Sequence, residues 1–119
     1  MFDEKTVVFV CRVCSRRILA MIPPFERHLK VSGYSPVRVD EGDLREILQE
    51  GKALPKAVVV FAFGDAYIYL VDSLIAEFPS LHVIYWLIPL VDSVPPKDAR
   101  VHLFSGILPS DLVAILEEC

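Results

Sequence analysis

The segment Ala57 to Phe63, with the sequence Ala-Val-Val-Val-Phe-Ala-Phe, decides the fold class of this chain. Its seven residues are all apolar, they are rich in β-branched and aromatic types, and Gly64-Asp65 follows them. This pattern is typical of a strand that is buried on both faces, as in a parallel sheet covered by helices. We therefore expect it to be the central strand of an α/β domain.

Apolar and amphipathic segments alternate on both sides of this strand. Further strands are predicted at Thr6–Val10, Pro36–Val39, His82–Ile88 and Val101–Phe104. Helices are predicted to begin at the capping residues Ser15, Asp65 and Ser110, with a kink or restart at Pro23-Pro24 in the first. A further, charged helix is predicted over Asp40–Glu50. With right-handed crossovers, this rhythm predicts a flavodoxin-like three-layer sandwich around a five-stranded parallel sheet of order 2-1-3-4-5.

The composition narrows the class of protein. The 119 residues fit a single domain, 1–119, and the 54% apolar content predicts that some apolar surface lies at an interface. A net charge of −4 without a basic run gives no electrostatic footprint for nucleic acid. The longest apolar run, at 81–91, is too short to cross a bilayer, so no transmembrane segment is predicted.

The cysteine count and the first residues indicate a cytoplasmic location. Met1 to Lys5 is polar and carries two acids, unlike a signal peptide. Three cysteines, an odd number, favour a reducing compartment over a disulfide framework.

From Gly33 onward the chain resembles a response-regulator receiver domain of the CheY-like family. Residues 32–39 resemble the family's Gly-Tyr turn and second strand, residues 42–48 its second helix, and residues 57–63 its third strand. Residues 74–84 resemble the passage from the third helix to the fourth strand, and residues 108–116 resemble the final helix. The resemblance implies a signalling role in a two-component system. It also implies phosphoryl transfer to an aspartate at the end of the third strand, with Mg²⁺ held by acids after the first.

The residues that carry this chemistry in receivers are absent from the matching positions. Cys11 and Arg12 replace the acids, Phe61 lies where the aspartate is expected, Leu87 replaces the switch hydroxyl, and Ser105 replaces the lysine. Mg²⁺ needs oxygen ligands, and phosphoryl transfer depends on that metal. We interpret these five residues as a degenerate phosphorylation pocket without a cofactor or metal, in a module that is not an enzyme.

The segment between the fourth and fifth strands is shorter than in receivers, so the helix between them is expected to be reduced or lost. Receivers use the surface around that helix for dimers and partners, and the sequence there is strongly apolar. Two interpretations remain open. Either a long strand buries these residues, or they form an exposed patch for a protein partner or a second copy, made of Tyr85, Trp86, Leu87, Pro89 and Leu90.

A thiol enzyme is the alternative function. Cys11-x-x-Cys14 follows a strand and opens a helix, where the helix N-terminus and nearby arginines lower a thiol pKa, as in thioredoxin-like redox motifs. Cys11 and Arg17 also have the C-x5-R spacing of a cysteine phosphatase loop, but that loop lacks glycine here.

A zinc site would need two further ligands to join Cys11 and Cys14. The histidines His28, His82 and His102 are scattered along the sequence, and Cys119 is its last residue. We therefore expect the histidines to be structural.

Overall fold

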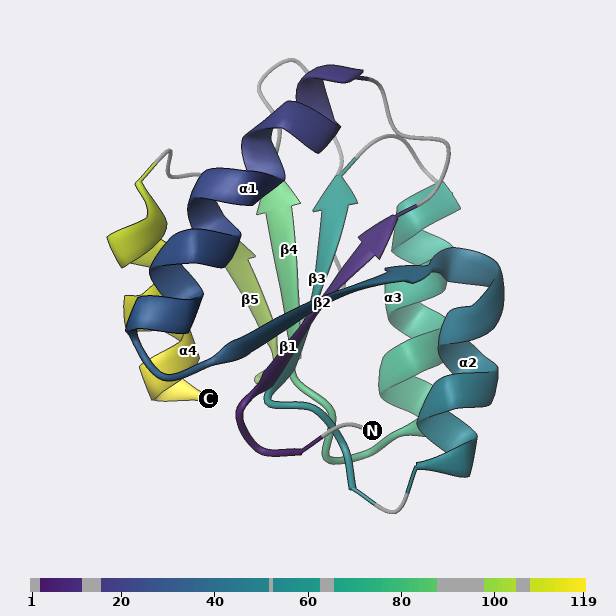
Figure 1. Ribbon diagram of the computed structural model, residues 1–119. Helices are drawn as coiled ribbons and strands as arrows, with labels where there is room; N and C mark the ends of the chain where they lie inside the picture. The colour runs from purple at the N-terminus through teal and green to yellow at the C-terminus, as the bar shows by residue number, and fades with distance from the viewer. Residues whose placement is uncertain (1–2, 12–15, 52, 63–65, 88–97, 105–107) are drawn as a thin grey trace.

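The computed structural model describes residues 3–11, 16–51, 53–62, 66–87, 98–104 and 108–119, with the backbone alone for 11, 16–19, 61–62, 66–68 and 87 (Figure 1). In chain order the elements are β1 (Thr6–Cys11), α1 (Arg16–Val31), β2 (Ser35–Asp40), α2 (Glu41–Glu50), β3 (Ala57–Ala62), α3 (Ala66–Glu77), β4 (Val83–Leu87), β5 (Val101–Phe104) and α4 (Pro109–Glu118). Among these helices, none is long and apolar enough to cross a membrane.

The strands form one parallel sheet in the order β2-β1-β3-β4-β5, as predicted. β3 lies in the middle, paired with β1 on one side and with β4 on the other. Helices α1 and α4 cover one face and α2 and α3 cover the other, which gives three layers (Figure 1). The flavodoxin-like architecture is confirmed.

The residues of β3 alternate between two hydrophobic cores. Val58 and Val60 pack in the core under α2 and α3, with Leu44 and Leu74. Ala57 and Val59 pack in the opposite core under α1 and α4. These four residues of β3 are fully buried, because helices cover both faces of the sheet.

Helix α1 runs from Arg16 to Val31 without a break and includes both Pro23 and Pro24, so a restart at the prolines is wrong and the kink stays a prediction. A proline inside a helix costs about 3 kcal/mol. Burial of Ile22 and Phe25 on either side of the prolines offsets that cost, since each large apolar side chain contributes about 1.5–3 kcal/mol. The helix ends as predicted before Gly33, which has a φ of 93° and donates its N–H to Lys30 O.

The starts of two helices can be compared with the predictions. Helix α2 begins one residue later than predicted, and Asp40 is its N-cap, because the Asp40 side chain accepts a hydrogen bond from Gly42 N–H at 2.8 Å. Ser110 is not the cap of α4, because that helix begins at Pro109, after Leu108. Proline at the first helical position needs no backbone partner and already has a helical φ.

Some predictions fall on residues outside the description. The predicted caps Ser15 and Asp65 are among them, and so is most of the connection from β4 to β5, at 88–97. The reduced helix expected in that connection therefore stays a prediction. Strand β4, Val83–Leu87, begins one residue later than expected, and its expected last residue, Ile88, lies outside the described residues.

Candidate functional site

The predicted phosphorylation pocket lies at the carboxyl edge of the sheet, where parallel strands end together. Cys11 ends β1, Phe61 is the penultimate residue of β3, and Leu87 ends β4 opposite Ala62. The fold therefore brings these three backbone positions to one edge, since β3 lies between β1 and β4. Arg12 and Ser105 are outside the described residues, as are the side chains at the other three positions.

The thiol alternative also falls on residues that the structure does not describe. Cys14 is outside the described ranges, and Cys11 and Arg17 are described by their backbone alone. The proximity of the two thiols and the arginine therefore stays a prediction.

The predicted contact patch is wrong for Tyr85 and Trp86. Tyr85 is fully buried in the core under α2 and α3, and Trp86 is 2% exposed in the opposite core. Trp86 packs against Phe25 and Phe104, with ring centroids 4.5 and 5.0 Å away. Successive residues of an interior strand point to opposite faces, and both faces are covered here.

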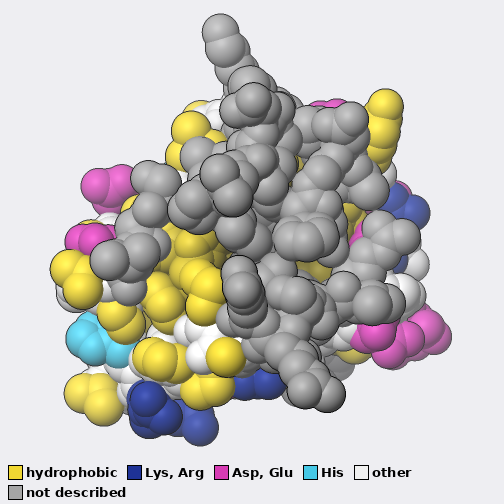
Figure 2. Space-filling view, turned by 90° about the horizontal axis from the view of Figure 1, so that it is seen from above, with side chains coloured by type: hydrophobic (Ala, Val, Ile, Leu, Met, Phe, Trp, Pro, Cys, Tyr) yellow, Lys and Arg dark blue, Asp and Glu magenta, His cyan; other side chains and the backbone are white. Residues whose placement is uncertain are grey.

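The rest of that patch consists of Leu87, Pro89 and Leu90, whose side chains are not described. Two large apolar side chains that follow β4 in the chain are exposed. Leu103 on β5 is 54% exposed, and Leu108, immediately before α4, is 56% exposed. Figure 2, which looks down on the carboxyl edge, shows hydrophobic side chains gathered on the left, the side of α1 and α4.

A groove of about 540 Å³ lies between α2 and α3, and no pattern in the sequence predicts it. Its polar lining includes Asp40, Glu41 and Ser73, together with Tyr69, which is 72% exposed. The Asp40 carboxylate already caps α2. The groove could admit a small polar molecule or a peptide side chain.

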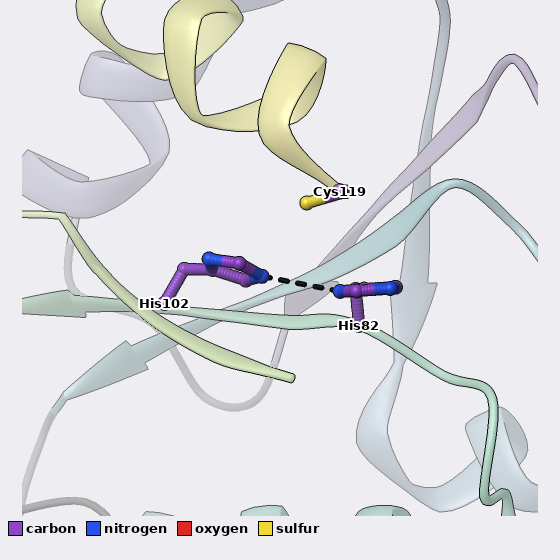
Figure 3. A group of neighbouring side chains, drawn as sticks. All are labelled: His82, His102 and Cys119. Carbon is purple, nitrogen blue, oxygen red and sulfur yellow. Dashed lines mark hydrogen bonds between the residues drawn. The ribbon is translucent and has the colours of Figure 1, made fainter. Parts of the chain in front are cut away.

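The opposite, amino-terminal edge of the sheet brings together His82, His102 and Cys119, so the histidines are not all scattered as expected (Figure 3). His82 Nδ1 lies 3.1 Å from His102 Nε2 in a hydrogen bond, and the two rings are stacked with centroids 5.3 Å apart. One ring nitrogen of each histidine and the Cys119 sulfur all lie within 4.8 Å of one another. All three side chains are half-buried.

The topology explains this convergence. Ile84 pairs in register with His102, and residues two apart on a strand share a face, so His82 and His102 both point toward the layer of α1 and α4. Helix α4 returns from the carboxyl edge after β5, and therefore places Cys119 at the amino edge. The alternation of residues along a strand indicates which face of the sheet each histidine is on. Only the strand order, with β4 next to β5, makes the two histidines neighbours.

Burial sets the electrostatics of the cluster. It lowers the pKa of His82, and the nearby charges of His102, Lys56 and Arg100 act in the same direction. Burial raises the pKa of the Cys119 thiol, which Lys56 partly opposes. Lys56 Nζ also donates to the backbone oxygen of Cys119 at 3.1 Å. The lowered pKa favours the neutral imidazole of His82.

Comparison with known proteins supports the fold. The structure is similar to the crystal structure of a response regulator receiver protein from Sinorhizobium medicae WSM419, with a TM-score of 0.66 and 13% sequence identity. The similarity covers 95% of this chain and 91% of that chain. No family model matches the sequence. No curated protein matches it either.

Proposed function

We propose that this chain, whose fold is that of a receiver domain, is a receiver-like signalling module that acts through protein contacts and accepts no phosphoryl group. The observation that carries the proposal is the identity of the residues where the strands end. β3 contains no acidic residue, and β1 ends at Cys11 and is followed by Arg12. Mg²⁺ binds oxygen ligands, and phosphoryl transfer relies on such a metal and a positioned acceptor.

The contact surface that we propose lies at the β5 edge of the sheet. Leu103 points to the face of α2 and α3, as does Val101, which packs against their core. Leu103 is nevertheless 54% exposed, and Leu108, which caps α4 four positions after the end of β5, is 56% exposed. Apolar side chains gathered at a sheet edge are typical of protein–protein contact sites. The simplest partner is a second copy, in the reducing cytoplasm that the cysteine count favours.

One experiment tests the signalling mechanism through the chain's single tryptophan. Trp86 is buried against Phe25 under α1, so its fluorescence reports on packing beneath the carboxyl edge. We expect no change in fluorescence when Mg²⁺ and beryllofluoride, a phosphoryl mimic, are added together. A saturable change that requires both components would show a functional phosphorylation pocket and contradict the proposal.

A second experiment tests the contact surface. Leu103→Lys places a charge at the proposed contact, and Val31→Lys is its matched control because Val31, at the end of α1, is 88% exposed. We expect wild type and the control to sediment as dimers and Leu103→Lys as a monomer. If Leu103→Lys sediments like the control, the β5 edge is not the dimer contact.

A further inference from the structure

We propose that His82, His102 and Cys119 form a binding site for a transition metal ion, with Zn²⁺ as the best match, at the amino-terminal edge of the sheet (Figure 3). Among the residues that the structure describes, this is the only such group of metal-ligating side chains. Two imidazoles and a thiol are donors that Zn²⁺ prefers, whereas Mg²⁺ and Ca²⁺ prefer oxygen. The site lies at the opposite edge from the degenerate pocket and is independent of it.

The distances suit a tetrahedral ion. Zn²⁺ binds nitrogen at about 2.0–2.1 Å and sulfur at about 2.3 Å, so adjacent ligand atoms of a tetrahedral site lie about 3.3–3.6 Å apart. The nitrogens of His82 and His102 are already 3.1 Å apart. One nitrogen of each ring and the Cys119 sulfur lie within 4.8 Å of one another, and rotation about the Cys119 side chain is the adjustment that would bring the sulfur to bonding distance.

Metal binding replaces interactions that the cluster already makes. In the hydrogen bond between His82 and His102, one ring nitrogen holds a proton and the other accepts it. A metal ion takes the place of that proton between the two lone pairs, and the proton moves to the other nitrogen of its ring. The Cys119 thiol donates to Ile115 O at 3.4 Å. On binding, the thiol releases its proton to solvent, and this weak hydrogen bond is lost.

The fold holds the ligands in place before the metal arrives. His82 immediately precedes β4 and His102 lies within β5, two strands paired along their length. Lys56, from the segment before β3, donates to the backbone oxygen of Cys119. A bound ion would tie the end of α4 to the sheet, and its fourth coordination position would remain open to water.

Cobalt provides a direct test, since Co²⁺ occupies zinc sites and absorbs light. The chain is prepared without a histidine tag and with Cys11→Ser and Cys14→Ser, which leaves Cys119 as its one thiol. We expect one Co²⁺ per chain, a thiolate-to-cobalt charge-transfer band, and displacement by Zn²⁺. His82→Gln should weaken Co²⁺ binding by more than about 100-fold, beyond the usual effect of losing an outer-shell partner, and Cys119→Ser should abolish the band.

The third histidine supplies the matched control. His28 lies on α1 and is not a member of the cluster, so His28→Gln should bind Co²⁺ like the parent. Equal affinity in His82→Gln and His28→Gln, or a band that survives Cys119→Ser, would overturn the proposal. If a site variant fails to fold, the rate of alkylation of the wild-type chain tests whether Cys119 binds the metal. Zn²⁺ should slow iodoacetamide modification of Cys119 at least roughly tenfold, and an unchanged rate would overturn the site.

Discussion

Replacement of Trp86 by alanine tests where this side chain lies. Trp86 is 2% exposed and contacts Phe25 and Phe104, whose own centroids are 5.9 Å apart, so the three rings form one cluster between α1 and the sheet. Removing a buried tryptophan costs about 3–5 kcal/mol, because apolar contacts are lost and a cavity remains. Since domains of this size have total stabilities of about 5–15 kcal/mol, we expect the variant to lose much of its stability.

The assay is urea unfolding followed by circular dichroism, because the variant has no tryptophan fluorescence. The matched control is Tyr69→Ala, which removes an aromatic side chain that is 72% exposed and should change the free energy of unfolding by no more than about 0.5 kcal/mol. Trp86→Phe keeps an aromatic ring in the cluster and should cost less than Trp86→Ala. A loss below about 1 kcal/mol in Trp86→Ala would show that the indole lies at the surface and would refute the packing described above.

Three further predictions concern local features. Asp40→Ala should lower the free energy of unfolding by about 1 kcal/mol in urea titrations, because the N-cap of α2 is lost. The control is Asp43→Ala, which removes an exposed carboxylate, and equal effects of the two substitutions would contradict the cap. Gly33→Ala should cost about 1–2 kcal/mol in the same assay, because alanine is strained at a φ of 93°, and a neutral result would contradict the turn. The Arg100 guanidinium, and then the Arg100 backbone N–H, hold the pKa of Asp98 below 3.8. The stability from this pair is therefore complete above pH 3.8 and lost as the pH falls through the lowered pKa. Thermal melts of Asp98→Asn should show a smaller loss on acidification than wild type, and identical losses would contradict the pairing.

The sequence was sufficient for the sheet and for most element positions. The β-branched run of β3 is buried on both faces whatever covers it, and the rhythm of strands and helices leaves few topologies open. A helix was predicted over Asp40–Glu50, and α2 spans Glu41–Glu50, although the cap that the Asp40 side chain supplies was not predicted. Pro23 was misjudged because its local cost is outweighed by burial on either side, which depends on tertiary packing.

The sites were harder to predict than the fold. The burial of Trp86 depends on α1 crossing the sheet at Phe25, a contact between residues 61 positions apart in the chain. The cluster of His82, His102 and Cys119 depends on strand order, on shared faces and on the return of α4 together. The cluster cannot be predicted from the spacing of its ligands in the sequence. His82 and His102 are 20 residues apart, His102 and Cys119 are 17 apart, and they follow no local motif.

The most direct test of the central claim is the intact mass of the protein after incubation with Mg²⁺ and an acyl phosphate. Asp65 is the only acidic residue in the stretch 57–71 that contains the end of β3, so Asp65→Asn is the matched variant. A receiver-like module that accepts no phosphoryl group predicts an unchanged mass for both proteins. A stoichiometric gain of one phosphoryl group in wild type that disappears in Asp65→Asn would contradict it.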